Sequence, residues 1–289
     1  MPHLLSSFFA GSPRTVRALL VGATTLVASS VVAREYWLAP RQFEVRVGTR
    51  QYVARHTGAG FDAQPWQVSS RSVRRLLHVA PGRTTDLTAA IATGDTLRTT
   101  LAFTRAGTNL VALRTTETLA LLDGNTFNAS LRTEGLESVL AQRTTNDQLA
   151  QPGREAFSQC AKTLVQVGDT RAAATPDDTC WRQVVGLPLE LVPERNPYRL
   201  RAGDSLTLRL LVQGRPAAGQ LVQVWHRKAA GAVGAPLRLR SDLRGRVHLL
   251  LPAATEILVG CVRMTPHSQR DSADWRTTRT SLTFGGPRH

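Results

Sequence analysis

Acidic residues are absent from the first 32 positions of this chain, and lysine is almost absent from all of it. Lys162 and Lys228 are the only lysines, so 34 of the 36 basic residues are arginines. These arginines are scattered over outward-facing strand positions, as Arg46 and Arg209 illustrate, and are not clustered with interleaved aromatics. This pattern argues against a nucleic-acid-binding protein and indicates a solvated basic surface. It leaves open a nonspecific affinity for anionic lipid or polysaccharide.

Short catalytic motifs are also missing. The chain has no G-x-S-x-G elbow, no phosphate-binding G-x-x-x-x-G-K, no H-E-x-x-H and no dinucleotide fingerprint. Asp177 and Asp178 are neighbours in a stretch rich in alanine and threonine, which is typical of a solvated linker and not of an acid and base held at a cleft. We therefore expect a protein that is not an enzyme.

The N-terminus has the pattern of a secretory signal peptide. Arg14 and Arg17 precede an apolar run over 18–32, and Val31-Val32-Ala33 predicts cleavage after Ala33. The alternative, an uncleaved anchor, is disfavoured because the polar-interrupted run falls short of the roughly 20 residues that a spanning helix needs. No cysteine lies near the cleavage site, so lipidation is not expected. We expect a periplasmic or secreted protein without stable membrane insertion after cleavage.

Alternating residues predict β-strands in much of the remaining chain. In 205–210 every second residue is leucine, a turn-rich stretch follows over 214–219, and a second alternating run covers 221–225. The runs 99–104 and 110–115 show the same pattern, and a turn is expected between them at 105–109. Both pairs predict antiparallel hairpins. Because no helical pattern separates the strands, we expect a mainly β protein built from immunoglobulin-like or transthyretin-like antiparallel sandwiches.

The domain organisation follows from these runs. After the signal peptide, 1–33, we expect an N-terminal sandwich domain over 34–167, a linker loop over 168–186 and a C-terminal immunoglobulin-like sandwich domain over 187–286. Leucine and valine at helical spacing predict a short helix near 129–142, and a second candidate helix begins near Arg154.

Three cysteines remain after cleavage. Cys160 and Cys180 flank a low-complexity stretch, so in an oxidising compartment a disulfide between them is the obvious pairing. Cys261 lies in an apolar run and is expected to be a small buried hydrophobic residue.

Several motifs together resemble a known family. They are the run 34–40, Glu134-Gly135-Leu136, the stretch 161–168, the segment 188–204 with Asn196-Pro197-Tyr198, and the terminal run 281–284. This combination is similar to the exported domain-of-unknown-function family 4198, grouped with periplasmic components of nickel and cobalt ABC uptake systems. The resemblance covers nearly the whole chain after the signal peptide. It implies an accessory role in nickel or cobalt transport and an inner-membrane transport component as partner.

Two departures from the family pattern bear on metal binding. Relatives commonly carry histidine where this chain has Arg34 and Arg263, and a guanidinium cannot ligate a metal. The candidate ligands are then Glu35, His226 and His248, since the two histidines lie in predicted strands and could face each other across one sheet. Neither histidine has metal-ligand spacing, so a structural or solvated role is the alternative.

Two functions from different classes stay open. The first is an exported binding or accessory protein of nickel or cobalt uptake. The second is a structural or adhesive envelope sandwich that binds no metal. The fold alone does not separate them.

Overall fold

The computed structural model describes residues 35–66, 70–92, 98–169, 178–228, 231, 233–269 and 271–288. All of them belong to one compact unit. The expected signal peptide and the residue after its cleavage site lie outside the described residues. Strands dominate the described part of the chain, so the expected mainly β class is confirmed.

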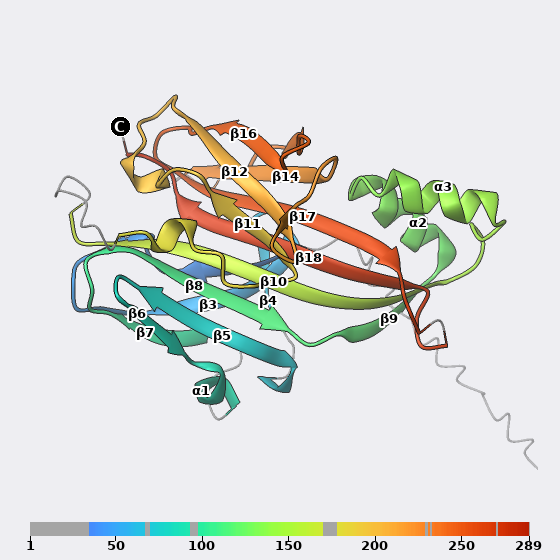
Figure 1. Ribbon diagram of the computed structural model, residues 1–289, viewed down its shortest axis with the longest axis horizontal. Coiled ribbons are helices and arrows are strands. Elements are labelled where there is room, and N and C mark those ends of the chain that lie inside the picture. Colours follow the sequence, from blue (N-terminus) through green and yellow to red (C-terminus); the bar gives the residue numbers. More distant parts are fainter. Residues whose placement is uncertain are drawn as a thin grey trace, which may run out of the picture. The chain divides into compact units, whose positions relative to one another are not determined.

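A ten-stranded sheet, here called the central sheet, runs through this unit (Figure 1). Its strands follow the order β15-β14-β17-β18-β10-β8-β5-β6, and β2 and β9 also pair with β10. The bounds are β2 Glu44–Val45, β5 Val73–Ala80, β6 Arg83–Asp86, β8 Gly107–Thr115, β9 Thr118–Leu122, β10 Gly153–Val167, β14 Leu221–Lys228, β15 Leu237–Arg240, β17 Thr255–Pro266 and β18 Trp275–Gly285.

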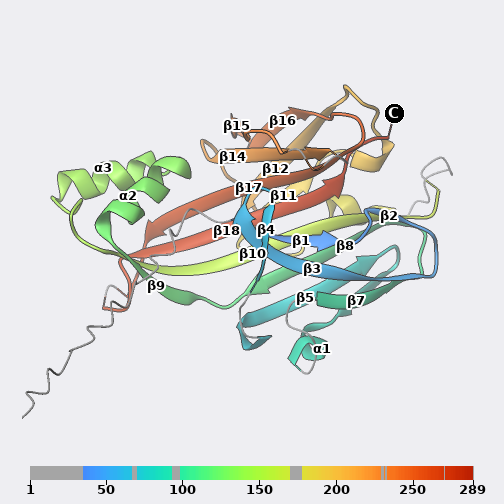
Figure 2. The same ribbon diagram turned by 180° about the vertical axis from the view of Figure 1, so that it is seen from behind.

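Two four-stranded sheets cover the central sheet, as Figures 1 and 2 show from opposite sides. The first outer sheet contains β1 Glu35–Pro40, β3 Thr49–Ala59, β4 Asp62–Pro65 and β7 Arg98–Phe103. The second outer sheet contains β11 Leu189–Pro193, β12 Ser205–Val212, β13 Arg215–Pro216 and β16 Arg246–Leu250.

Alternation along β18 explains the three layers. Ser281 and Thr283 donate hydrogen bonds of 2.6 Å from their hydroxyls to backbone carbonyls of β1, so this face carries the first outer sheet. Leu282 and Phe284 point the other way, into the core shared with the leucines of β11, β12 and β16. Because successive side chains of a strand point to opposite faces, one strand can supply two cores.

Two helices cover the end of the central sheet beside β9 (Figure 1). Helix α2, Gly124–Thr133, begins where the Asp123 carboxylate accepts a 2.9 Å bond from the backbone N–H of Thr126, and α3 spans Glu137–Thr145. Phe127 and Leu131 of α2 are fully buried in a cluster with Trp275. Short helical turns complete the described structure: α1 Thr88–Ala92, η1 Ser70–Ser72, η2 Cys180–Arg182 and η3 Pro197–Arg199.

One of the two expected helices is present and the other is wrong. The helix expected near 129–142 is present as two short helices, α2 and α3, because the chain turns between them at Gly135, whose φ is +69°. The helix expected from Arg154 is part of strand β10, where ladders to β9, β8 and β18 satisfy the backbone. Tertiary pairing outweighs the weak local helical pattern there.

Both expected hairpins are also wrong. The strands over 205–212 and 221–228 are β12 of the second outer sheet and β14 of the central sheet. Likewise, β7 belongs to the first outer sheet and β8 to the central sheet. The turns therefore carry the chain from one layer to the next, and the strands face each other across a core.

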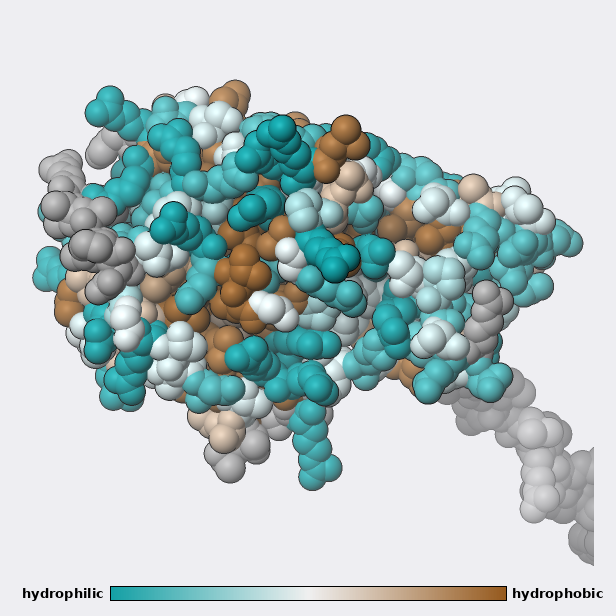
Figure 3. Space-filling model, in the orientation of Figure 1, coloured by the Kyte–Doolittle hydropathy of each residue, from teal (hydrophilic) through white to brown (hydrophobic). Residues whose placement is uncertain are grey.

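The expected domain segments 34–167 and 187–286 share the central sheet. Strand β10 of the first segment pairs with β18 of the second over nine residue pairs, and the pairing is parallel, not antiparallel. The linker region 168–186 thus separates the segments in sequence but does not divide the sheet. The face seen in Figure 3 is mainly hydrophilic, with hydrophobic side chains gathered near its centre.

Candidate functional site

A small acidic pocket lies where β1 crosses the central sheet. Its cavity is about 20 Å³, enough for one water-sized occupant. The lining residues come from β1, the end of α2, β14, β17 and β18; they are Glu35, Tyr36, Glu134, Leu221, Gln223, Trp225, Gly260, Cys261, Val262, Arg279 and Thr280.

Glycines make room for the indole of Trp225 at this pocket. Gly60 has a φ of +60°, and a Cβ there would lie 2.6 Å from Cδ1 of Trp225. A Cβ on Gly260 would lie 3.2 Å from Cζ3 of the same indole. The ring therefore depends on two backbone positions without side chains, and it forms one wall of the pocket.

One arginine holds two buried carboxylates beside the pocket. The Arg279 guanidinium donates to Glu155 over 2.7 Å and to Glu134 over 3.0 Å. Both glutamate side chains are at most 5% exposed. Burial lowers the pKa of Arg279, but the two carboxylates outweigh it and raise the pKa overall. The arginine therefore stays charged.

Glu134 is not fully satisfied by this arrangement. Its Oε2 is buried and has no hydrogen-bond partner among the described residues. Burial raises the pKa of Glu134, and the Arg279 charge offsets that effect only in part. A buried acceptor without a partner is costly, so this oxygen marks a place where a donor or a cation would be stabilised.

Glu35 adds a third carboxylate. Its Oε2 accepts a 3.0 Å hydrogen bond from the backbone N–H of Gly60. Burial raises the pKa of Glu35 to about 7, and the nearby Glu134 charge adds to the effect. Glu35 and Glu134 thus line the pocket with a single arginine, Arg279, which is also paired with Glu155, so the pocket has an excess of negative charge when the carboxylates are ionised. Proton release from Glu35 near neutral pH would increase that excess.

Cys261 also lines the pocket but offers no thiolate. Burial raises the pKa of its thiol to about 12, so the thiol stays protonated at neutral pH. This agrees with the buried hydrophobic role expected for Cys261.

The expected metal ligands Glu35, His226 and His248 are not brought together. His226 lies on β14 on the same side as Val224, which packs toward the second outer sheet, whereas Glu35 lies on the opposite face of the central sheet. His248 belongs to β16 of the outer sheet, is exposed, and has its Nδ1 2.9 Å from the Thr207 hydroxyl. The histidines cannot face each other across one sheet, because they belong to two sheets.

A closed metal site is also missing from the described residues, in which no group of three His, Cys, Asp or Glu side chains is placed to hold an ion. Arg263, the second departure from the family pattern, lines a different hollow from Glu35. Restoring histidine at position 263 would therefore not complete a site at Glu35.

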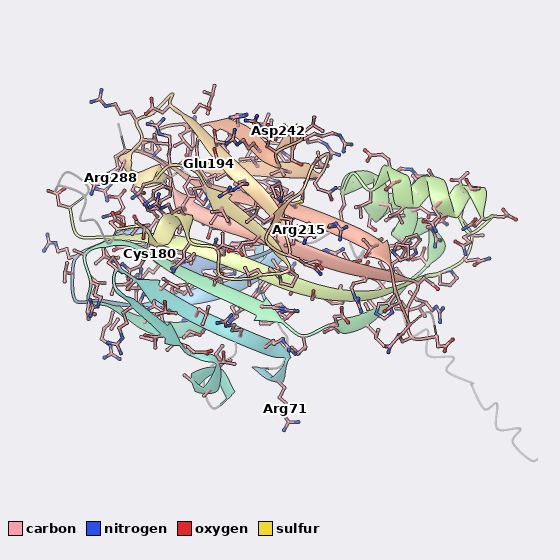
Figure 4. All side chains as sticks on the ribbon, in the orientation of Figure 1. Arg71, Cys180, Glu194, Arg215, Asp242 and Arg288 are labelled. Carbon is pink, nitrogen blue, oxygen red and sulfur yellow. The ribbon has the colours of Figure 1, made fainter. Side chains whose placement is uncertain are left out.

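The expected disulfide between Cys160 and Cys180 is absent from the structure. Cys160 has a free thiol, 1% exposed, in the middle of β10. Burial raises its pKa to about 12. Cys180, labelled in Figure 4, begins the turn η2 and packs in the core beneath the second outer sheet. The two residues flank a sequence loop, but loop spacing does not set the direction in which their sulfurs point.

Sequence reasoning missed Glu134, Glu155 and Arg279 as a unit. Glu134 follows Arg132 and Thr133 at a helix end, where the local sequence gives no sign of burial. Glu155 and Arg279 lie in strand-like stretches, and charges in such stretches are usually paired when buried. That signal was available, but the partners lie 124 and 145 positions apart along the chain.

The described part of the chain contains no helix that is both long and apolar enough to cross a membrane.

No curated protein matches the sequence. Among solved structures, a two-domain fibronectin type-III segment from chicken tenascin is similar at 12% identity and a TM-score of 0.22, with 86% of this chain and 97% of that chain covered. That TM-score is too low to transfer any site. The sequence matches the model of a family described as a domain of unknown function (DUF4198) over residues 31–265. The chain therefore belongs to domain-of-unknown-function family 4198.

Proposed function

We propose that this chain is an exported, non-enzymatic binding protein whose acidic pocket takes one small cation. The observation that carries the proposal is the buried Oε2 of Glu134, which has no hydrogen-bond partner in the described part of the chain and lines a cavity of one-ion size next to Glu35. The predicted signal peptide supports export to the periplasm or the outside of the cell.

The family resemblance favours nickel or cobalt as the cation and a membrane transport component as partner. The donors around the cavity are carboxylate oxygens, which suit these ions less well than imidazole does. A binding protein that passes its cargo to a transporter needs reversible binding, and weak oxygen ligation would permit it. We therefore expect labile binding of nickel and cobalt.

Calorimetric titration of the chain that begins at Arg34 tests the proposal with nickel, cobalt, magnesium and calcium. We expect binding of at least one ion, and Glu35→Gln or Glu134→Gln should weaken it at least tenfold, because interactions with charged groups contribute about 1.5–3 kcal/mol. Affinity should also rise between pH 6 and pH 8 as Glu35 loses its proton.

Glu137→Gln is the matched control, since this glutamate lies on α3 and its side chain is 61% exposed. It removes the same charge but should leave the affinity unchanged. Denaturation curves establish that each variant is folded. The proposal is overturned if none of the four ions binds, or if binding persists in both pocket variants. A lack of binding by all four ions would favour the structural or adhesive envelope protein.

A further inference from the structure

A second hollow lies on the other face of the central sheet, beyond the end of β11. Its volume is about 610 Å³, which is in the range of small-molecule sites. Strands β8, β10, β17 and β18 form its floor, and the loops over 186–189 and 212–214 form its rim. Arg215, labelled in Figure 4, directly follows the second of these loops.

Arginines dominate the charge of this hollow. Arg114, Arg263 and Arg276 line it, and Glu117 is the only acidic residue among the described lining residues. Arg276 is matched, because its Nε lies 2.7 Å from Oε1 of Glu117. Among the lining residues that the structure describes, no carboxylate is left for Arg114 and Arg263, so this lining has an excess of two positive charges.

The unmatched arginines are partly desolvated. Arg114 and Arg263 are both half-buried, and the Nε of Arg114 is buried without a hydrogen-bond partner among the described residues. A guanidinium offers several donors in a planar fork that matches the oxygens of phosphate, sulfate or carboxylate. A buried donor without an acceptor is costly, so an oxyanion at this place would be stabilised.

Strand register brings hydroxyl groups next to these guanidinium groups. Arg263 of β17 lies opposite Thr278 of β18, and Thr278 lies opposite Ser158 of β10. Neighbouring strands are about 4.8 Å apart, so these three positions span roughly 10 Å on the same face. Ser158 and Thr278 lie on adjacent strands and both line the hollow, so their hydroxyls can donate to the same oxyanion.

A buried ion pair holds the rim of this hollow. Lys162 and Glu190 are at most 1% exposed, and Nζ of Lys162 lies 3.0 Å from Oε1 of Glu190. The Glu190 carboxylate also accepts bonds of 2.9–3.1 Å from the backbone N–H groups of residues 185–187. The loop that faces the arginines is therefore anchored to the central sheet and does not depend on a ligand for its position.

We propose that this hollow binds a phosphate or sulfate group carried by a small organic molecule. Arg114 and Arg263 hold the oxyanion from two sides, and the hydroxyls of Ser158 and Thr278 complete its hydrogen bonds. The rest of the molecule occupies the remaining volume. This site lies on the opposite face of the sheet from the acidic pocket and does not depend on the function proposed above.

Isothermal titration with glucose 6-phosphate, inorganic phosphate, inorganic sulfate and glucose tests this proposal at constant ionic strength. We expect binding of the charged probes and none of glucose. Tighter binding of glucose 6-phosphate than of inorganic phosphate identifies an organic ester as the ligand class. Equal affinities would overturn that part and assign the site to a free oxyanion.

Arg114→Gln and Arg263→Gln should each weaken binding of glucose 6-phosphate at least tenfold. Arg215→Gln is the matched control, because this exposed arginine lies next to the rim and outside the hollow, and its loss should change the affinity less than twofold. If Arg114→Gln does not fold, Arg263→Gln alone decides. No binding by any charged probe, or an equal loss in the Arg215 variant, would overturn the proposal.

Discussion

Glu35 shows how burial controls a single residue of this protein. Burial raises its pKa to about 7, whereas in the unfolded chain the pKa returns to the ordinary 4.5. The folded state therefore binds the proton more tightly, and the stabilisation is complete below about pH 4.5 and is lost as the pH rises through about 7. We expect the free energy of unfolding of the wild-type protein, relative to Glu35→Gln, to fall by roughly 2 kcal/mol between pH 5 and pH 8.

Urea denaturation at a series of pH values measures this difference. Glu137→Gln serves as control, because hydrogen bonding to its backbone and to Arg240 lowers the pKa of Glu137, so it does not titrate in this window. A difference between wild type and Glu35→Gln that stays constant across the window would show that Glu35 is solvated in the folded protein.

At the scale of elements, the turn between α2 and α3 places Glu134 at the acidic pocket. Gly135 adopts a φ of +69°, and a Cβ there would lie 2.5 Å from Cδ2 and 2.9 Å from Cβ of Leu221. Gly203 has a similar φ of +86° but open space around it. We expect Gly203→Ala to cost about 1 kcal/mol from backbone strain and Gly135→Ala roughly 2 kcal/mol more from the clash. Thermal or urea unfolding compares the two variants, and equal losses would show that Leu221 of β14 moves aside without cost.

At the scale of the whole described unit, the parallel pairing of β10 with β18 joins the two sequence segments. A chain of residues 35–168 would lose β17, β18 and the second outer sheet, and the buried Lys162 would lose Glu190. Breaking a buried pair by removing one partner typically costs about 3–5 kcal/mol, before the lost core is counted. We expect residues 35–288 to unfold in a single transition and residues 35–168 to show no cooperative unfolding in urea. A cooperative transition of the shorter chain would mean that the N-terminal segment is an independent domain.

The strands could be predicted from the alternation of apolar and polar residues, because this pattern depends only on neighbouring positions in the sequence. The alternation in 205–210 predicts a half-buried strand, and β12 is that strand, since each residue's face depends only on its own position in the pleat. The pairing of that strand could not be predicted, because adjacent strands in sequence can pair directly or face each other across a core. The helix predicted from Arg154 was wrong for the same reason. Strand β10 pairs with strands from distant parts of the chain, and the local sequence does not show that pairing.

The sequence by itself determined the class of this protein, the positions of several strands, the basic arginine-rich exterior and the membership of the family. Tertiary structure alone decided which charged residues meet. Arg279 reaches Glu134 and Glu155 across 145 and 124 positions, and Arg114 and Arg263 line one hollow although 149 positions separate them. A local sequence pattern predicts which residues are buried, because the face that a residue occupies depends only on its own position in the strand. A site depends instead on how distant strands are placed relative to one another, and only the packed sheets determine that placement.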